Sequence, residues 1–407
     1  MKILIIVKNF WPELTGIGVC TGDLADWLHT CGHRVSVITT VPHYPAWSVA
    51  DNEKILLWCK DTRKPYRVMR GATFIPKKPG AMSRVLNALS FAATATPLAM
   101  LEALRQKPDI VMAVVPTLMA VPAMHAIGAL TGARSWIHVQ DLEVDAAIEM
   151  KLLTGRVARL ASTLERWLLR RAGVLSTISE KMAARLAEKC PGADIKVFPN
   201  WIDDVEIRPL AGPSPLRAKL KIAAQQKLVL FTGSLVAKQG LEIIPAAARL
   251  LKDRSDIYFL VCGEGPLKET IQQQGAPLGN MGFLPLQPRT EFNALLNAAD
   301  IHLLPQLPNM SDLVMPSKLG PLLASGRPVV ASVDATGTVA RMVEGAGIIV
   351  PPGDAAALAA AIAALADNPQ KRRQLGERAR ARAVETLGRS RILSQIDRML
   401  SAGLGKP

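Results

Sequence analysis

The sequence is poor in aromatic residues and in cysteine. Phe, Trp and Tyr together make up 4% of its 407 residues, while Ala, Leu and Val are abundant. This composition favours layered α/β domains over a β-sandwich. The five cysteines (Cys20, Cys31, Cys59, Cys190 and Cys262) include no Cys-x-x-Cys pair. An odd number of cysteines without metal-binding spacing argues for a reducing cytoplasm.

Long apolar runs are also lacking. The run Ile3–Val7 is short and is followed at once by Asn9 and Pro12, so we expect a first strand there and not a signal peptide. The longest apolar stretch, residues 85–101, is interrupted by Asn87 and Pro97. It is predicted to form an interfacial helix or a core helix and not a membrane span.

Acidic residues are outnumbered by basic ones. Asp and Glu number 34 against 49 Lys and Arg, which gives a formal net charge of +15. Such a balance predicts an anionic partner: nucleic acid, an acidic membrane surface or a phosphorylated ligand. Nucleic acid is the weakest of these, because the sequence contains no zinc finger, RNP box or basic coiled coil. Part of the excess (residues 371–373, Arg378, Arg380 and Arg382) falls on one late helix, where a solvated face is the simpler interpretation.

No Asp-x-Asp pair occurs in the chain. A diphosphate held by a carboxylate-bound metal is therefore not expected, and no metal ligands are assigned.

Short apolar runs alternate with helical stretches along the whole chain. This alternation predicts parallel sheets with crossover helices. The expected strands are residues 2–7, 34–39, 110–115, 135–139, 174–177, 228–232, 257–262, 300–304, 329–331 and 347–350. A Pro-rich polar segment follows residues 198–203 and suggests a domain boundary after residue 204. The predicted fold class is α/β, with two doubly wound domains, 1–204 and 205–385, that face a cleft and bind ligands at the strands' carboxyl ends.

Residues 316–332, PSKLGPLLASGRPVVAS, read as a loop, a short apolar helix, a turn and a buried strand. Pro316 and Ser317 suit a helix start, with Ser317 as the capping residue. Lys318 in the first turn makes this helix start suitable for binding an anion. An ordinary αβ unit accounts for the same pattern.

A glycine-rich loop joins the first strand to the first helix. Gly16 and Gly18 would let the backbone approach a phosphate at the helix N-terminus. The spacing is not a full Gly-x-Gly-x-x-Gly motif, and a tight turn that needs positive φ explains it equally well.

A polar cluster follows the strand predicted at residues 135–139. His138 and Gln140 alternate on one side, and His138 is open to two interpretations, a catalytic group or a satisfied core histidine. Asp141 is the stronger candidate, because a carboxylate just past a strand end can bind a hydroxyl or accept a proton.

Several short motifs occur in a fixed order along the chain. They are HYPxW (His43–Trp47), VVPTL (Val114–Leu118), HVQDxEVD (His138–Asp145), STIS (Ser176–Ser179), FPNW (Phe198–Trp201), KQGLE (Lys238–Glu242) and PSKL (Pro316–Leu319). Together they resemble glycosyltransferase family 4, in its colanic-acid branch. The resemblance implies a GT-B fold of two Rossmann-like domains, in which a C-terminal helix of roughly residues 373–400, within the segment 386–407, packs back toward the N-terminal domain.

The resemblance also implies where a nucleotide-sugar donor binds. In the loop that resembles the family's diphosphate clamp, Gly233 allows close approach, Ser234 stands at the family's Arg position and Gln239 at its Lys position. Lys238 precedes Gln239 and is either the donor's cation or a solvated loop lysine. The remaining donor-site residues implied by the family's motifs are Gly16, Gly18, Gly263, Glu264, Phe283, Ser317, Lys318 and Leu319. For Phe283 a core position is the simpler interpretation.

The sequence departs from the family at its most quoted motif, two glutamates separated by seven residues. Pro321 stands at the second Glu position and Leu313 at the first, with Asp312 adjacent. We therefore expect Lys318, Asp312 and backbone amides to hold the donor, with Asp141, His138 and Asp312 as the catalytic candidates.

The resemblance implies a retaining, metal-independent transferase without a cofactor. Its donor would be GDP-fucose or another nucleotide-sugar, its acceptor a lipid-linked oligosaccharide, and the departing phosphate would take the acceptor's proton. The expected location is the cytoplasm, peripheral to the inner face of the membrane. Basic residues beside the apolar stretch 85–101 fit an anionic surface; they are Lys77, Lys78, Arg84, Arg105 and Lys107. A core helix with a solvated basic rim is the alternative.

Two other functions share this fold. One is a nucleotide-sugar-binding protein without transferase activity, which the missing glutamates favour. The other is a sugar-nucleotide epimerase, against which the FPNWID segment and the basic apolar stretch both speak.

Overall fold

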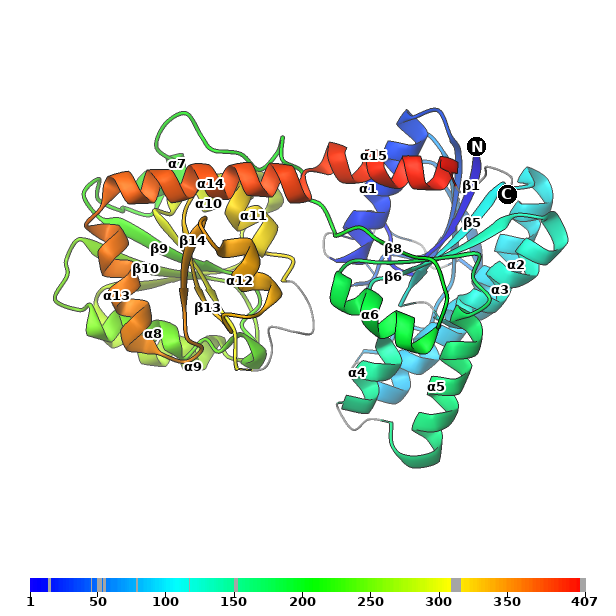
Figure 1. The fold of residues 1–407 in the computed structure, drawn as a ribbon, viewed down its shortest axis with the longest axis horizontal. Coiled ribbons are helices and arrows are strands. Elements are labelled where there is room, and N and C mark those ends of the chain that lie inside the picture. The colour runs from blue at the N-terminus through cyan, green and yellow to red at the C-terminus, as the bar shows by residue number, and fades with distance from the viewer. Residues whose placement is uncertain are drawn as a thin grey trace. The chain divides into compact units, whose positions relative to one another are not determined.

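The chain forms two compact units. In the computed structural model, residues 1–13, 16–44, 46–49, 53, 56–77, 80–116, 118–149, 153–308 and 316–402 are described. Unit 1 consists of Met1–Asn200 with Ile392–Pro407, and unit 2 of Trp201–Arg391. Each unit is a central sheet flanked by helices (Figure 1). The predicted boundary after residue 204 lies close to Asn200, where the chain first passes from unit 1 into unit 2.

Unit 1 contains an eight-stranded sheet in the order β3-β4-β2-β1-β5-β6-β7-β8. Its strands are β1 (Lys2–Ile6), β2 (Arg34–Thr40), β3 (Trp58–Asp61), β4 (Arg67–Gly71), β5 (Ile110–Val115), β6 (Arg134–Val139), β7 (Val174–Thr177) and β8 (Ile195–Val197). Neighbouring strands are parallel except for β3 and β4. The strand order extends from β1 in both directions, so the crossover helices cover both faces of the sheet. The strands predicted for this half are confirmed.

Three strands of this sheet are absent from the prediction: β3, β4 and β8. Their sequences, WCKD, RVMRG and IKV, are short and mix charged residues with apolar ones. The apolar pattern that predicts a strand is therefore weak in all three. Both edge positions of the sheet belong to this group, and charged side chains at an edge reach solvent and discourage pairing with other chains.

The helices of unit 1 follow from the apolar spacing between its strands. They are α1 (Ile17–Thr30), α2 (Ala81–Gln106), η1 (Leu118–Ala120), α3 (Val121–Thr131), α4 (Glu143–Glu149), α5 (Gly155–Leu169), α6 (Glu180–Lys189) and the later part of α15 (Arg389–Ala402). Phe91, Met124 and Leu168, from three of these helices, pack with the β1 and β5 side chains in one buried core.

Unit 2 contains a six-stranded sheet in the order β11-β10-β9-β12-β13-β14, with all strands parallel. Its strands are β9 (Lys227–Thr232), β10 (Ile257–Cys262), β11 (Met281–Leu284), β12 (Ile301–Pro305), β13 (Val329–Ser332) and β14 (Gly347–Val350). Asp300, predicted as the first residue of a strand, precedes β12. Its carboxylate instead accepts hydrogen bonds from the Leu228 amide and from Arg217 Nη1, each at 2.9 Å.

Helices cover both faces of this second sheet (Figure 1). They are α7 (Pro215–Lys219), η2 (Ala237–Gln239), α8 (Ile243–Leu250), α9 (Lys268–Gly275), η3 (Ala276–Leu278), α10 (Arg289–Ala298), α11 (Leu319–Ala324), α12 (Thr338–Val343), α13 (Ala355–Ala366) and α14 (Pro369–Leu387). Both predicted layers of this half, a parallel sheet and its crossover helices, are therefore present.

The prediction of one continuous helix over residues 373–400 is wrong. The chain forms two helices there, α14 and α15, and Gly388 separates them. The Ile202 amide donates to the Leu387 carbonyl, and the Arg389 amide donates to Asp204 Oδ1 at 3.1 Å. A Cβ at position 388 would lie 2.4 Å from the Val384 carbonyl oxygen, so only glycine fits this break.

The arginines of α14 only partly form the solvated face expected from the sequence. Arg372, Arg380 and Arg382 donate to backbone carbonyls in, or just after, the last turns of other helices. Their acceptors include Ala366 in α13, Ala324 in α11, and Met342 and Glu344 at the end of α12. These guanidinium groups satisfy carbonyls that a helix end leaves unpaired. Lys371, Arg373 and Arg378 are exposed, as predicted.

The apolar stretch predicted at residues 85–101 lies within α2. Among the described residues, Met82–Gln106 is the one helix long and apolar enough to cross a membrane by length and composition. Of its most apolar window, 33% is buried in the structure. The helix therefore contributes one side to the core of unit 1 and leaves another side exposed.

Arg70 is buried in unit 1 and joins its outer strands to the loop after β1. Its Nε donates to Asp61 Oδ2 at 2.8 Å, Nη1 to the Thr40 carbonyl at 2.7 Å and Nη2 to the Trp11 carbonyl at 2.6 Å. Burial alone would raise the pKa of Asp61, but hydrogen bonds from Arg63 and Arg70 outweigh it and hold that pKa below its usual range.

Replacing this guanidinium should destabilise unit 1. Arg70→Met leaves two buried carbonyls without their donor, and we expect the free energy of unfolding to fall by about 3–5 kcal/mol. The matched control is Arg34→Met, whose side chain is exposed and which should change stability by less than about 0.5 kcal/mol. Urea denaturation of both variants measures the difference. Equal midpoints would contradict the structural role of Arg70.

Candidate functional site

The predicted donor-site residues of unit 2 gather where its strands end. In the sheet order, β10 lies on one side of β9 and β12 on the other. Ligands of open parallel sheets bind beside such a reversal of strand order, at the carboxyl ends. The loop after β9 contains Gly233, Ser234 and Gln239, and the loop after β10 contains Gly263 and Glu264.

The glycines of these two loops allow their backbones to touch. The Gly233 amide donates to the Cys262 carbonyl at 3.0 Å, and the Leu235 amide donates to the Glu264 carbonyl at 2.8 Å. A Cβ at Gly263 would lie 2.0 Å from the Gly233 carbonyl oxygen, and one at Gly265 would lie 2.4 Å from the Leu235 carbonyl oxygen. Gly233 itself has φ of 139°. Glycine at position 263 is thus required by the neighbouring loop, with or without a ligand.

Lys318 reaches the loop after β9 from a distant part of the sequence. Its Nζ donates to Gln239 Oε1 and lies 4.2 Å from the centroid of the Phe231 ring. A Cβ at Gly233 would lie 3.7 Å from the same nitrogen. A cation therefore lies directly against a glycine backbone at the carboxyl edge of the sheet, an arrangement suited to an anionic ligand.

The predicted capping role of Ser317 is wrong. The N-cap of α11 is Lys318, with no side-chain capping bond, and Ser317 is exposed. Leu319 is fully buried, and its amide donates to the Pro316 carbonyl at 3.0 Å. Of these three predicted donor-site residues, the geometry brings Lys318 to the β9 loop, while Leu319 belongs to the core.

The other predicted residues of unit 2 have various surroundings. Ser234 is exposed beside Gly233, and Glu264 pairs with Lys268 at 2.9 Å. Phe283 is half-buried on β11 and packs against a hydrophobic core, which favours the core interpretation. Asp312 lies outside the described residues, as does the side chain of Lys238.

His138 has the surroundings of a core histidine. Its Nδ1 lies 3.0 Å from Ser176 Oγ, and its ring stacks on Phe198 with centroids 4.5 Å apart. Burial lowers the pKa of His138 to about 3, so the ring is neutral at physiological pH. The structure therefore favours a satisfied core histidine over a catalytic group.

Asp141 lies exposed at the carboxyl end of β6, as predicted, and a second carboxylate follows it. Glu143 is the first residue of α4. It keeps exposed surface but lies in a crowded region, and this loss of hydration raises its pKa to about 7. Lys8, just after β1, opposes the shift, while the Asp141 carboxylate adds to it. Lys8 and Asp141 are therefore each close enough to Glu143 to affect its charge.

Glu143 was not among the predicted site residues. Its raised pKa comes mainly from burial by the surrounding fold, which no local sequence pattern signals. The available signal was its position: a carboxylate two residues beyond Asp141, at a helix start that follows a strand end.

The glycine loop of unit 1 closes over a buried carboxylate. Glu13 is 5% exposed and accepts hydrogen bonds from the amides of His43 at 3.1 Å and Tyr44 at 3.0 Å. A Cβ at Gly18 would lie 3.2 Å from Glu13 Oε2, so a small residue is needed there. Gly16, with φ of 60°, is the N-cap of α1. Gly18 thus has a packing role, and the turn interpretation of Gly16 is consistent with its φ.

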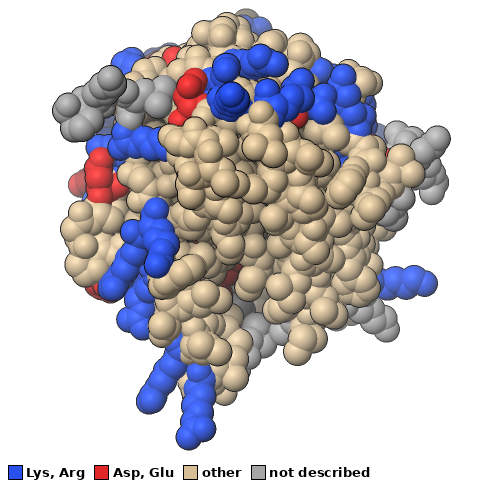
Figure 2. All heavy atoms as spheres, turned by 90° about the vertical axis from the view of Figure 1, so that its right-hand side faces the viewer, with Lys and Arg blue, Asp and Glu red and all other residues tan. Residues whose placement is uncertain are grey.

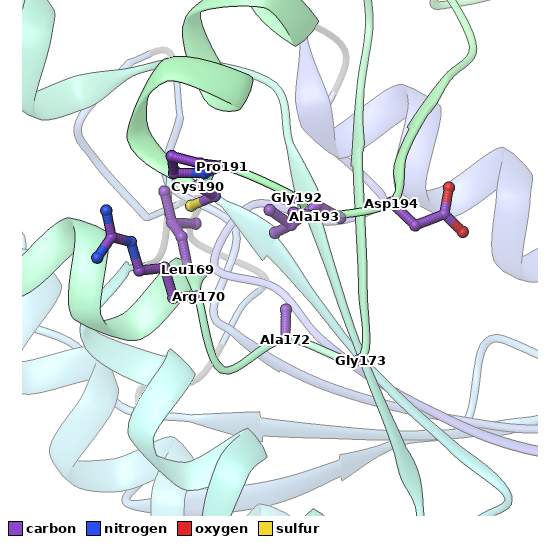
Figure 3. Close-up of a pocket in the computed structure, with 10 residues that line it drawn as sticks. Leu169, Arg170, Ala172, Gly173, Cys190, Pro191, Gly192, Ala193 and Asp194 are labelled. Carbon is purple, nitrogen blue, oxygen red and sulfur yellow. The ribbon is translucent and has the colours of Figure 1, made fainter.

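A cavity of about 410 Å³ lies away from these strand ends. Leu169, Cys190 and Ala193 line it, together with Gly173 and Asp194, which precede β7 and β8 (Figure 3). It therefore opens at the amino ends of these strands, opposite to the predicted site. Within the described part of the chain, no three His, Cys, Asp or Glu side chains are grouped as a metal site.

Two family models match most of the sequence. The one described as "Glycosyl transferase 4-like domain" matches residues 15–201, and the one described as "Glycosyl transferases group 1" matches residues 214–382. The two matches meet close to the boundary between the units.

Curated relatives of similar length are also named as glycosyltransferases. The chain is 37% identical over 375 residues to WcaI of Escherichia coli (strain K12), which is named as a colanic acid biosynthesis glycosyl transferase; the match covers 89% of this chain and 91% of WcaI. It is 28% identical over 225 residues to the 2-deoxystreptamine glucosyltransferase of Streptomyces kanamyceticus, covering 52% of this chain and 55% of that protein.

Solved structures share the fold over nearly the whole chain. Sucrose-phosphate synthase from Thermosynechococcus elongatus matches with a TM-score of 0.75 at 17% identity, covering 99% of each chain. Anabaena Alr3699/HepE in complex with UDP-glucose matches with a TM-score of 0.69 at 19% identity, covering 99% of this chain and 100% of that one. The predicted fold class, two Rossmann-like α/β domains, is confirmed.

The close contact between the loops after β9 and β10 leads to a prediction about stability. Gly263→Ala forces the two backbones apart, so we expect unit 2 to lose about 1–3 kcal/mol of unfolding free energy. Gly212→Ala is the control, because nothing lies within 4 Å of a Cβ at that position. Thermal and chemical denaturation compare the two. A neutral Gly263→Ala would show that the loops do not need this close approach.

Proposed function

Because the chain belongs to glycosyltransferase family 4 and has the GT-B fold, we propose that it transfers a sugar from a nucleotide-sugar to a lipid-linked oligosaccharide in the biosynthesis of a colanic-acid-like exopolysaccharide. The likeness to WcaI over most of both chains supports the pathway. The proposed donor is GDP-fucose or another nucleotide-sugar. Transfer proceeds with retention of anomeric configuration and without a metal ion.

The observation that carries this proposal is the position of Lys318. Its ammonium group lies against Gly233 and Gln239 at the reversal point of the unit 2 sheet. In the proposed complex the donor diphosphate binds there, with Lys318 and the amides of the glycine loop around it. As the sugar bond breaks, negative charge grows on the departing phosphate, and a fixed cation stabilises that charge.

At position 321 this sequence has Pro where the family has Glu. This difference makes Lys318 more important for donor binding. Pro321 occupies the third position of α11 and has no carboxylate to bind the ribose hydroxyls. In this proposal the diphosphate contact therefore contributes a larger share of donor affinity than in relatives that have the glutamate.

The acceptor's proton has a candidate recipient in unit 1. A carboxylate with a pKa of about 7, as Glu143 has, is well matched to accept a proton near neutral pH. Asp141 would hold the acceptor hydroxyl beside it. The departing phosphate is the other group that could take the proton, and a pH profile decides between the two.

The proposed location is the cytoplasmic face of the inner membrane, where the lipid-linked acceptor resides. Four of the five predicted basic residues within or near α2 are described: Lys77, Arg84, Arg105 and Lys107. Arg105 also pairs with Glu102 at 2.9 Å. An anionic membrane surface is the proposed partner of this side of unit 1; Lys78 lies outside the described residues. No nucleic-acid partner is proposed.

The proposal is tested by nucleotide release. The purified chain is incubated with GDP-fucose or a panel of UDP-sugars, a lipid-linked acceptor extract, and EDTA. Release of one nucleotide that depends on the acceptor supports transfer, and the anomeric configuration of the product reports retention. Tight donor binding without acceptor-dependent release would instead support the alternative, a nucleotide-sugar-binding protein.

Lys318 is expected to act on donor binding. Loss of a charge-assisted hydrogen bond costs about 1.5–3 kcal/mol, so Lys318→Met should raise the donor KM by roughly one to two orders of magnitude. Lys318→Arg should recover part of the affinity. Lys252→Met, an exposed lysine of the same unit, serves as the control and should leave KM unchanged. Steady-state kinetics with varied donor would detect the difference, and an unchanged KM in Lys318→Met would rule out this diphosphate site.

Glu143 is expected to control the acid limb of the pH profile. Proton acceptance requires the ionised form, so kcat/KM should fall by nearly tenfold for each pH unit below its pKa of about 7. Glu143→Gln should remove this limb and lower kcat by about 10²–10⁴-fold, whereas Glu188→Gln, an exposed glutamate of the same unit, should match the parent. If Glu143→Gln keeps the parent profile, the departing phosphate takes the proton.

A further inference from the structure

Helix α5 presents a continuous apolar stripe to solvent. Val157 is 60% exposed, Leu160 71%, Leu164 44% and Trp167 49%. Their spacing of three, four and three residues puts all four side chains on one face of a helix. Single exposed apolar residues are ordinary on protein surfaces, but a row of four large ones along one helix marks an interaction surface.

The other face of α5 is firmly attached to unit 1. Ala158, Leu168 and Leu169 are buried, and the last two belong to the main core of the unit. The Leu168 carbonyl accepts a hydrogen bond from His125 of α3 at 3.0 Å. The helix thus has its own buried side, and the exposed stripe is an additional apolar surface.

The charged residues around the stripe have one sign. The exposed ones on α5 and in the two residues after it are all arginines: Arg156, Arg159, Arg166, Arg170 and Arg171. The one acidic residue of the helix, Glu165, is buried and bound to Lys189. At the end of the stripe, the Arg171 guanidinium lies 3.8 Å from the centroid of the Trp167 ring. Apolar side chains bordered by arginines, with a tryptophan at one end, suit the boundary between lipid headgroups and acyl chains.

A cavity of about 390 Å³ lies between α4 and α5, on the side of α5 that is turned away from the stripe. Arg159, Ser162 and Arg166 of α5 line it, with Asp145, Ile148, Ala158 and Lys189. Lys189 is already paired with Asp145 and Glu165. Because these lining residues face away from the stripe, the cavity is not part of the docking surface.

The sheet topology puts α5 on the same face of unit 1 as α2. The crossovers from β4 to β5, β5 to β6 and β6 to β7 step in one direction along the sheet, so right-handed connections place α2, α3 and α5 on one face. Figure 2 shows the side of unit 1 that is on the right in Figure 1. Few Asp and Glu are visible there, and Lys and Arg gather along its upper border and at its lower left.

We propose that α5 docks unit 1 on an anionic phospholipid bilayer. The stripe of Val157, Leu160, Leu164 and Trp167 inserts at the headgroup boundary, and the arginines beside it bind lipid phosphates. This inference rests on the membrane partner in the proposed function and specifies the element that binds it. The uniform positive charge beside the stripe favours lipid over a second copy of this basic chain, which the same arginines would repel.

The test is co-sedimentation of the full chain with vesicles. Vesicles of phosphatidylcholine with about one-third phosphatidylglycerol are compared with pure phosphatidylcholine, at low and high salt. The parent should bind the anionic vesicles at low salt and lose affinity as salt rises, because salt screens the arginine contacts. A Leu160→Gln/Trp167→Gln variant should bind at least tenfold more weakly. Leu250→Gln/Leu286→Gln, two exposed leucines of unit 2, is the matched control and should bind like the parent.

Two further measurements separate the possible failures. A Leu101→Gln/Leu104→Gln variant changes exposed leucines of α2; if it abolishes binding and the α5 variant does not, the α5 inference fails while membrane binding stands. If the parent ignores vesicles yet releases nucleotide with acceptor, the inference fails and the transferase proposal stands. Sedimentation velocity reports the oligomeric state: a parent dimer that the α5 variant splits, with vesicle binding unchanged, would make the stripe an interface between copies. Equal melting temperatures and equal donor KM verify that the α5 variant is folded.

Discussion

Parallel strands end at a common edge, and every loop that leaves this edge carries backbone groups that the sheet no longer satisfies. In unit 1 buried charges meet this requirement: Arg70 donates to the Thr40 and Trp11 carbonyls, and Glu13 accepts from the amides of His43 and Tyr44. In unit 2 the loops after β9 and β10 pair with each other, which requires glycine at position 263. The candidate sites of both units lie at these edges, and in unit 2 the paired loops present Gly233 and Gln239 to Lys318.

The sequence predicts most of the strands, because a buried parallel strand has a strong local pattern. It fails where the structure depends on partners far away in the chain. β4 contains two arginines in five residues, yet one of them, Arg70, is buried, because Asp61 and two carbonyls surround it. The break at Gly388 has one local signal, the glycine itself, because its neighbours are good helix formers and the interrupting contacts come from Ile202 and Asp204. The arginines of α14 read as a solvated face because carbonyl acceptors cannot be read from a side-chain pattern.

Prediction of the candidate site had the same limits. The segment around Lys318 was identified from its resemblance to a family, and the structure adds the reason for its position, a contact with the Gly233 loop. Ser317 was assigned a cap by a rule that holds on average, but α11 starts one residue later. His138 is buried, and the half-buried Phe283 packs against a hydrophobic core, so the structure favours the core interpretation of both. Glu143 was missed because burial, which raises its pKa, depends on how the chain folds around it and not on its local sequence.

The chain enters unit 2 after Asn200 and returns to unit 1 at Ile392. Topologically, unit 2 is therefore an insertion within unit 1, and Ile392, Leu393 and Ile396 complete the burial of the first unit after the second has been traversed. A chimera built by joining the front half of one relative to the back half of another would combine mismatched parts of a single hydrophobic core. An exchange of donor specificity between relatives has to replace an internal cassette with two junctions, one in the FPNW segment and one just beyond Gly388, while retaining the recipient's own final helix.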